Sequence, residues 1–130
     1  MNFALDLAEK YTAEIVLLSV FNPVFVPFGV EPSLSDAKVM ENYLEDLKAY
    51  HENVLSENLQ KITELKPNLK VSTKLKKGRP ADKIIETAKE GNFNLIVMGS
   101  RGLGGIKQLF LGSVSDRVAD EAPCPALMVR

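Results

Sequence analysis

Along the 130-residue chain, segments whose apolar residues recur at the helical period alternate with short segments that are typical of β-strands. The first apolar set recurs at the 3.6-residue period, which predicts a short amino-terminal helix. Its members are Phe3, Ala4, Leu7, Ala8 and Tyr11. Residues 15–21, IVLLSVF, follow as a short, continuous, charge-free run. Such a run is typical of a strand buried on both faces, as in a parallel sheet.

A second stretch of helical periodicity occupies residues 39–65. Apolar residues recur there every three or four positions, which predicts one long amphipathic helix. They are Val39, Met40, Tyr43, Leu44, Leu47, Tyr50, Val54, Leu55, Leu59, Ile62 and Leu65. Ser35 and Asp36 offer helix caps, and Pro67 ends the helix. Residues 22–33 contain three prolines and a glycine, so we expect a loop before it.

The second half of the chain repeats the alternation of strand and helix. Residues 71–76 alternate apolar and polar, which predicts a strand with one solvent-facing side, or an edge strand. We expect a helix from Pro80 to Gly91 with Ile84, Ile85 and Ala88 inward, then a buried strand at 93–98. A helix at 113–122 and a short strand at 125–129 complete the chain. This order predicts a single α/β domain, 1–130, with a sheet of parallel strands.

Composition narrows the classes of function. Hydrophobic residues make up 45% and charged residues 25%, with a formal net charge of −1. No global field therefore recruits nucleic acid or anionic lipid, and we expect neither partner. The single cysteine, Cys124, permits no intrachain disulfide and favours a reducing compartment. No apolar run approaches the ~20 residues of a membrane span, and no signal peptide is evident. We expect a cytoplasmic protein.

One glycine-rich segment, GSRGLGGIKQLFLGS at 99–113, carries the candidate chemistry. It joins the carboxyl end of a predicted strand to the amino end of a predicted helix, where open α/β sheets bind ligands. Glycines allow close backbone approach, and a helix amino terminus favours phosphate. The segment is not a P-loop, because Gly105 stands where lysine is required. It is not a dinucleotide fingerprint either, because Lys107 stands where the last glycine is required.

The spacing that remains is G-x2-G-x9-G-S, formed by Gly99, Gly102, Gly112 and Ser113. It resembles the nucleotide-binding signature of the universal stress protein family. The segments "AEIVLLSV", "KGRPADKIIETAKEGNFNLIVMGSRG" and "LGSVSDRVADEAPCPALMVR" also resemble strands and helices of that family. The resemblance implies an open, mostly parallel sheet with helices on both faces, Rossmann-like and similar to the adenine nucleotide alpha hydrolase fold.

The resemblance also implies a site for ATP or a related adenine nucleotide. Val20 would contact adenine, and Met98 and Gly99 would line the ribose and base side. Gly102, Gly112, Ser113 and Val114 would hold the phosphates through backbone N–H groups and the Ser113 hydroxyl, with Arg101 adding charge. From the residues alone, Ser113 is equally a helix N-cap with Asp116 three positions on. Mg²⁺ or Mn²⁺ could mediate between Asp116 and a phosphate.

The sequence departs from the family pattern at its amino terminus. The family opens with a strand and an acidic loop whose aspartate contacts adenine, and that strand is central in the sheet order 3-2-1-4-5. Neither precedes "MNFALDLAEK" here. Met1 is then an internal methionine of a longer chain, or the short form is genuine with a rearranged or partner-completed sheet. In the short form, strands 14–21 and 93–98 must pair directly, or another chain must fill the gap.

Three functions remain open. The first is a stress-response protein that binds ATP and signals by its bound state, without efficient turnover, because no P-loop lysine or acidic metal-binding strand is present. The second is an interaction module that binds no nucleotide. It would dimerise through the strand Ala126–Val129, the edge by which the family commonly pairs. A slow ATPase is the third. The first function implies the same homodimer.

Overall fold

The structure is a computed structural model that describes residues 2–23, 37–99 and 112–129. The predicted caps Ser35 and Asp36 and the predicted ligands Arg101 and Gly102 lie outside the described residues. The chain divides into two compact units, Met1–Gly78 and Arg79–Arg130, which we describe separately. The assignment of 1–130 to a single domain stays a prediction.

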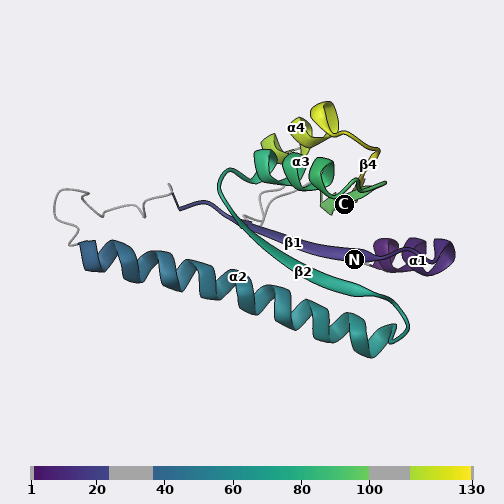
Figure 1. Ribbon diagram of the computed structural model, residues 1–130, viewed down its shortest axis with the longest axis horizontal. Coiled ribbons are helices and arrows are strands. Elements are labelled where there is room, and N and C mark those ends of the chain that lie inside the picture. The colour runs from purple at the N-terminus through teal and green to yellow at the C-terminus, as the bar shows by residue number, and fades with distance from the viewer. Residues whose placement is uncertain (1, 24–36, 100–111, 130) are drawn as a thin grey trace. The chain divides into compact units, whose positions relative to one another are not determined.

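The first unit contains a pair of parallel strands and two helices (Figure 1). Its elements are α1 (Asn2–Tyr11), β1 (Ile15–Phe21), α2 (Ala37–Leu65) and β2 (Val71–Lys77). β1 pairs with β2 in register from Ile15 opposite Val71 to Phe21 opposite Lys77. Helix α2 packs on both strands. All four predicted elements are confirmed, and the three lysines of β2 give it the charged character expected of an edge strand.

The buried residues of α2 in the first unit are Ile62, which is fully buried, and Leu55. α1 contributes Leu5 and Ala8, which are 2% and 5% exposed. The prediction for α1 was partly wrong: Phe3 and Tyr11, assigned to the inner face, are 61% and 70% exposed. The apolar residues of α1 surround so much of the helix that its periodicity alone did not fix the inward side.

A contact between β1 and α2 defines which face of β1 is covered. The Oγ atom of Ser19 lies 2.6 Å from Nδ1 of His51, and the ring of Phe21 lies 6.1 Å from the imidazole. Ser19 and Phe21 therefore face α2. Because side chains alternate along a strand, Val16, Leu18 and Val20 face the opposite side. They are only half-buried in the structure, not buried as expected for a strand covered on both faces.

Burial of His51 between these partners gives a testable pH dependence. Desolvation lowers the pKa of His51 below its ordinary 6.5, so folding favours the neutral ring. The associated stability is fully present above pH 6.5 and is lost as the pH falls through the folded-state pKa. We expect the free energy of unfolding of the native chain to fall between pH 7 and pH 5 more steeply than that of His51→Gln. Parallel urea titrations would measure it; identical pH profiles would contradict it.

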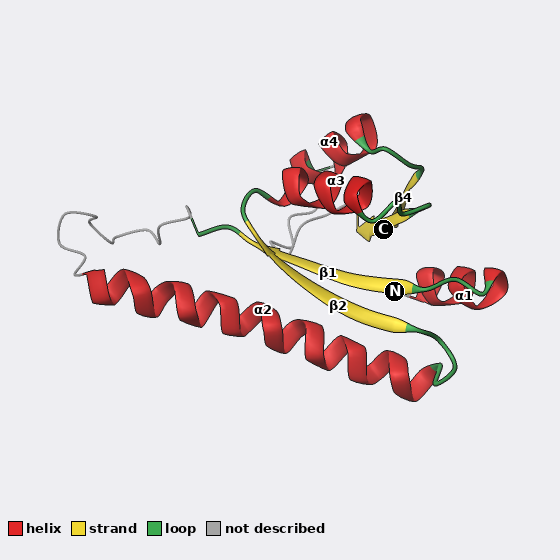
Figure 2. Ribbon diagram, viewed as in Figure 1, coloured by secondary structure: helices red, strands yellow, loops and turns green. Residues whose placement is uncertain are grey.

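The second unit also pairs two parallel strands and packs two helices together (Figure 2). Its elements are α3 (Pro80–Glu90), β3 (Ile96–Gly99), α4 (Ser113–Glu121) and β4 (Ala126–Val129). β3 pairs with β4 from Ile96 opposite Ala126 to Gly99 opposite Val129. Val118 is fully buried, with Ala81 and Ala88 nearly so. The predicted inward residues Ile84 and Ile85 are half-buried.

Strand β3 is shorter than predicted, because it begins at Ile96 and not at Phe93. The backbone N–H of Phe93 donates to the carbonyl of Ala88 and so closes the end of α3. Asn92 adopts a left-handed conformation, with φ of 51°, and turns the chain there. The prediction started the strand too early because Phe93 is apolar, but the backbone of Phe93 is hydrogen-bonded to the end of α3.

The described strands form two sheets of two strands each, β1 with β2 and β3 with β4. Strands 14–21 and 93–98 belong to different units, so their direct pairing, one of the two alternatives for the short form, stays a prediction. Of the described helices, none combines the length and apolar character needed to cross a membrane.

Candidate functional site

The amino terminus of α4 carries the best-defined part of the candidate site. Gly112 is the N-cap residue, with φ −67° and ψ 164°, and Ser113 is the first helical residue. The alternative that Ser113 is the N-cap is therefore wrong. Gly112 has no side chain to accept hydrogen bonds from the first turn, which a capping serine or aspartate would do. The N–H groups of the first turn, from Ser113 on, therefore receive no hydrogen bond from an N-cap side chain, and the dipole of α4 favours an anion there.

Two serines in this turn have different roles. Ser115 is buried, and its hydroxyl donates to the carbonyl of Gly112 over 3.2 Å, which fixes the first turn. Ser113 is exposed. The N–H of Asp116 donates to the same carbonyl over 2.8 Å and begins the helical ladder. The turn thus presents one exposed hydroxyl and backbone N–H groups, which is the donor set that a phosphate accepts.

Strand β3 places two further predicted residues at its carboxyl end. Met98 is half-buried and Gly99 is exposed, and they pair with Met128 and Val129 of β4. Gly99, Gly112, Ser113 and Val114 therefore all belong to the second unit, on the two elements that flank the glycine-rich segment. Val20 belongs to the first unit, near the carboxyl end of β1 and on the face turned from α2. No group of three or more His, Cys, Asp or Glu residues suited to a metal ion occurs among the described residues.

Arg117 ties the candidate helix to its neighbour. Its guanidinium pairs with Asp82 in the first turn of α3, and its Nε lies 2.7 Å from Glu121 of α4. The hydrogen bond to Glu121, and then the one to Asp82, raise the pKa of Arg117 above its usual range. Thirty-five positions separate Arg117 from Asp82, so no local sequence pattern signalled this pair. The network connects α3 to the helix that carries Ser113.

We expect Arg117→Ala to lower the melting temperature by about 1–4 °C, because exposed ion pairs contribute little individually and this variant removes two. The loss should shrink in 1 M NaCl, which screens exposed charges. Lys83→Ala is the matched control, since it removes only the Lys83–Glu86 pair within α3. Differential scanning fluorimetry measures both. An equal loss in the two variants would contradict a connection between helices.

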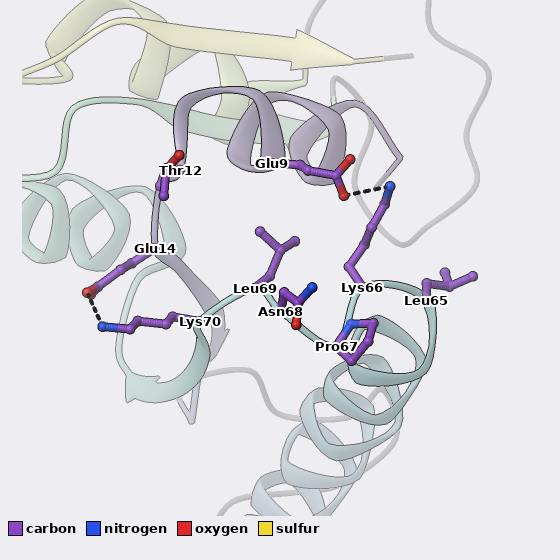
Figure 3. Close-up of a pocket in the computed structure, with 10 residues that line it drawn as sticks. Glu9, Thr12, Glu14, Leu65, Lys66, Pro67, Asn68, Leu69 and Lys70 are labelled. Atoms are coloured by element: carbon purple, nitrogen blue, oxygen red, sulfur yellow. Dashed lines mark ion pairs between the residues drawn. The ribbon is translucent and has the colours of Figure 1, made fainter.

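A pocket of ≈ 520 Å³ lies at the amino-terminal ends of β1 and β2, away from the carboxyl strand ends that the sequence pointed to (Figure 3). It lies between the end of α1 and the α2–β2 loop. Two ion pairs flank it: Lys66 with Glu9 at 2.8 Å, and Lys70 with Glu14 at 3.9 Å. Glu9 raises the pKa of Lys66, chiefly through the hydrogen bond. The lysines are therefore already paired with carboxylates, and none of the predicted ligands lines this pocket.

A second hollow, also of ≈ 520 Å³, lies at the carboxyl end of the same sheet on its α2 side. Three apolar residues, three glutamates and two lysines line it. The lining residues are Phe21, Glu41, Leu44, Glu45, Lys48, Glu52, Leu75 and Lys77. Val20 is not among them, because its side chain faces the other side of the sheet. This hollow therefore adds no residue to the nucleotide site implied by the glycine motif.

Comparison with known proteins decides the family. A sequence model of the Universal stress protein family matches residues 1–130. The chain belongs to the universal stress protein family. The universal stress protein YxiE of Bacillus subtilis is 31% identical over 135 residues, covering 100% of this chain and 88% of that one. Universal stress protein UspA from Lactobacillus plantarum superposes with a TM-score of 0.79 at 25% identity, covering 99% of this universal stress protein and 86% of UspA.

Two other solved structures share the fold and contain a nucleotide. One is a universal stress protein in complex with cAMP, with a TM-score of 0.67 and 20% identity over 99% of this chain and 85% of that one. The other is an Arabidopsis thaliana family protein with AMP bound, with a TM-score of 0.52 and 21% identity over 98% and 75%. The α/β, Rossmann-like fold predicted for this universal stress protein is confirmed.

Proposed function

We propose that this chain binds ATP or a related adenine nucleotide at the amino terminus of α4 and acts in the stress response through its nucleotide-bound state. The observation that carries the proposal is the glycine N-cap of α4. Gly112 leaves the N–H groups of the first turn of α4 without a side-chain cap, and Ser113 is exposed beside them. Gly112 and Ser113 are also the last two residues of the G-x2-G-x9-G-S spacing.

Two further observations support the adenine class of ligand. Solved members of the fold hold AMP and cAMP, which share the adenosine moiety and a phosphate. The donor set at α4 suits the phosphate that these ligands share with ATP. In this proposal Gly102, Gly112, Ser113 and Val114 hold the phosphates, and Arg101 adds positive charge; Gly99 lines the ribose and base side. Met98 lines the ribose side, and Val20 contacts the base.

Nucleotide release from the purified protein tests the proposal. Denatured protein should release an adenine nucleotide detectable by mass spectrometry, and added ATP should raise the melting temperature, because a ligand that binds only the folded state stabilises it. The thermal scan is run with EDTA and with Mg²⁺ or Mn²⁺, so that a metal requirement becomes visible. Absence of co-purified nucleotide together with no thermal response to millimolar ATP would overturn nucleotide binding.

A homodimer that pairs β4 with its twofold mate is the assembly we propose for this function. Among the described strands β4 pairs only with β3, and its sequence ALMV is uncharged. An uncharged edge suits pairing with another strand. The same feature supports a second candidate function, an interaction module that dimerises without nucleotide. A slow ATPase ranks third, and phosphate release that saturates with ATP would favour it.

A further inference from the structure

The face of the β1–β2 pair that is turned from α2 carries a lysine beside Val20, the proposed contact of the base. Side chains alternate along each strand, so residues that pair in register share one face of the sheet. Val20 pairs with Lys76 of β2. Adjacent strands lie about 4.8 Å apart, which places the side chain of Lys76 directly beside that of Val20. The carboxyl end of this strand pair therefore presents an apolar group and an ammonium group together.

The hollow on the α2 side of the sheet confirms the face to which Lys76 belongs. Phe21, Leu75 and Lys77 line that hollow, whereas Val20 and Lys76 do not. Lys77 therefore lies on the α2 face, where three glutamates line the same hollow. Neither β1 nor β2 contains an acidic residue, so the two strands supply no carboxylate to Lys76 on its own face.

Lys76 also differs from the other lysines of β2 in its burial. It is half-buried, whereas Lys74 and Lys77 are exposed. In the part of the chain that the structure describes, Lys76 takes part in no ion pair. Partial burial of an ammonium group costs free energy unless the group gains a hydrogen-bond acceptor, and it offers three donors. A ligand that brings an acceptor to this end of the sheet would supply what the two strands lack.

We propose that Lys76 is a specificity-determining residue of the nucleotide site and donates a hydrogen bond to a ring nitrogen of adenine. The inference rests on the proposed function, in which Val20 contacts the base. A base held against Val20 lies within reach of a long side chain on the neighbouring strand. Adenine offers the ring acceptors N1, N3 and N7, and an ammonium group is a donor only. Val20 then contacts the face of the base, and Lys76 pairs with one of its edges.

Isothermal titration calorimetry with AMP and with ATP tests the contact in a Lys76→Met variant, which keeps an unbranched apolar side chain and removes the donors. We expect both affinities to fall by at least about fivefold and by the same factor, because the lost hydrogen bond is to the base. Lys77→Met is the matched control: it removes the same charge at the next position, on the other face of the strand. Its affinities should stay within about twofold of the native values.

Three results of this titration would overturn the inference. The first is an unchanged affinity in Lys76→Met, and the second is an equal loss in Lys77→Met, which would indicate a general effect of charge. The third is a loss that is larger for ATP than for AMP, which would place the ammonium group at the phosphates. A native chain that binds neither nucleotide would overturn the proposed function and this inference with it. Native binding with an unchanged Lys76→Met affinity would overturn the inference alone.

Deaza analogues of ATP identify the acceptor. The 1-deaza, 3-deaza and 7-deaza analogues each replace one ring nitrogen of adenine by a C–H group, which accepts no hydrogen bond. One of the three should bind the native chain and Lys76→Met with equal affinity, because it lacks the nitrogen to which Lys76 donates. The other two should still bind the native chain more tightly. If all three analogues distinguish the native chain from Lys76→Met, Lys76 does not donate to a ring nitrogen and the inference is wrong.

Discussion

Gly112→Val is expected to weaken ATP binding by at least about 100-fold while leaving the protein folded. The φ and ψ of Gly112, −67° and 164°, lie in the extended region that valine adopts without strain. Valine is a poorer N-cap than glycine, but the cost is about 1 kcal/mol or less. Its branched side chain would occupy the space before the first turn of α4. A phosphate would then lose hydrogen bonds to Ser113 and Val114, each worth about 1.5–3 kcal/mol when the acceptor is charged.

Isothermal titration calorimetry with ATP measures this prediction, with circular dichroism as the check on folding. Ala119→Val is the matched control, because it adds bulk at an exposed position of the same helix, remote from its amino terminus. We expect its affinity to stay within about twofold of the native value, as for a surface substitution that touches no ligand. If the Gly112→Val protein folds and binds ATP with native affinity, the assignment of the nucleotide site to the amino terminus of α4 is wrong.

Ile62→Ala should lower the free energy of unfolding by about 2–5 kcal/mol, the usual cost of truncating a buried isoleucine. Ile62 is 0% exposed and lies on the face of α2 that also buries Leu55. The substitution would leave a cavity, because a long helix packed on two strands can move only partly into the space of the removed atoms. A loss of this size is a large part of the stability of a small domain.

Urea denaturation at pH 7 measures the loss, with Leu65→Ala as the control on the same helix. Leu65 is 62% exposed, so its truncation should change the free energy of unfolding by no more than about 0.5 kcal/mol. If Ile62→Ala were tolerated with a loss below 1 kcal/mol, the described core of the first unit would be wrong.

The order of helices and strands could be predicted from the sequence, because the period of the hydrophobic residues and the positions of proline and glycine indicate the same boundaries. Pro67 follows the last turn of α2, and Gly91 follows α3 as its C-cap. The parallel pairing of IVLLSVF also followed from its uniform apolar character. The predicted boundaries were wrong where backbone hydrogen bonds or backbone angles determine where a helix begins or ends. Phe93 closes α3 in place of starting a strand, and Gly112 rather than Ser113 caps α4.

Contacts between residues far apart in the chain could not be predicted, because neither partner carries a local signal. Ser19 meets His51 only because α2 crosses the face of β1, and Arg117 meets Asp82 only because α3 and α4 pack together. In the candidate site, the glycine spacing predicted a helix amino terminus after Gly112, and α4 begins there. Which group caps that end depends on backbone angles that the spacing does not specify.

Amide chemical shifts during an ATP titration test the central claim most directly. If the nucleotide is held at the amino terminus of α4, the largest shifts in a ¹⁵N spectrum should fall on Gly112, Ser113 and Val114, with Gly99 following. The amides around the pocket at the other end of the first unit, such as Thr12 and Leu69, should stay unchanged. Saturable binding that leaves Ser113 and Val114 unmoved, or that shifts Thr12 and Leu69 instead, would contradict the assignment.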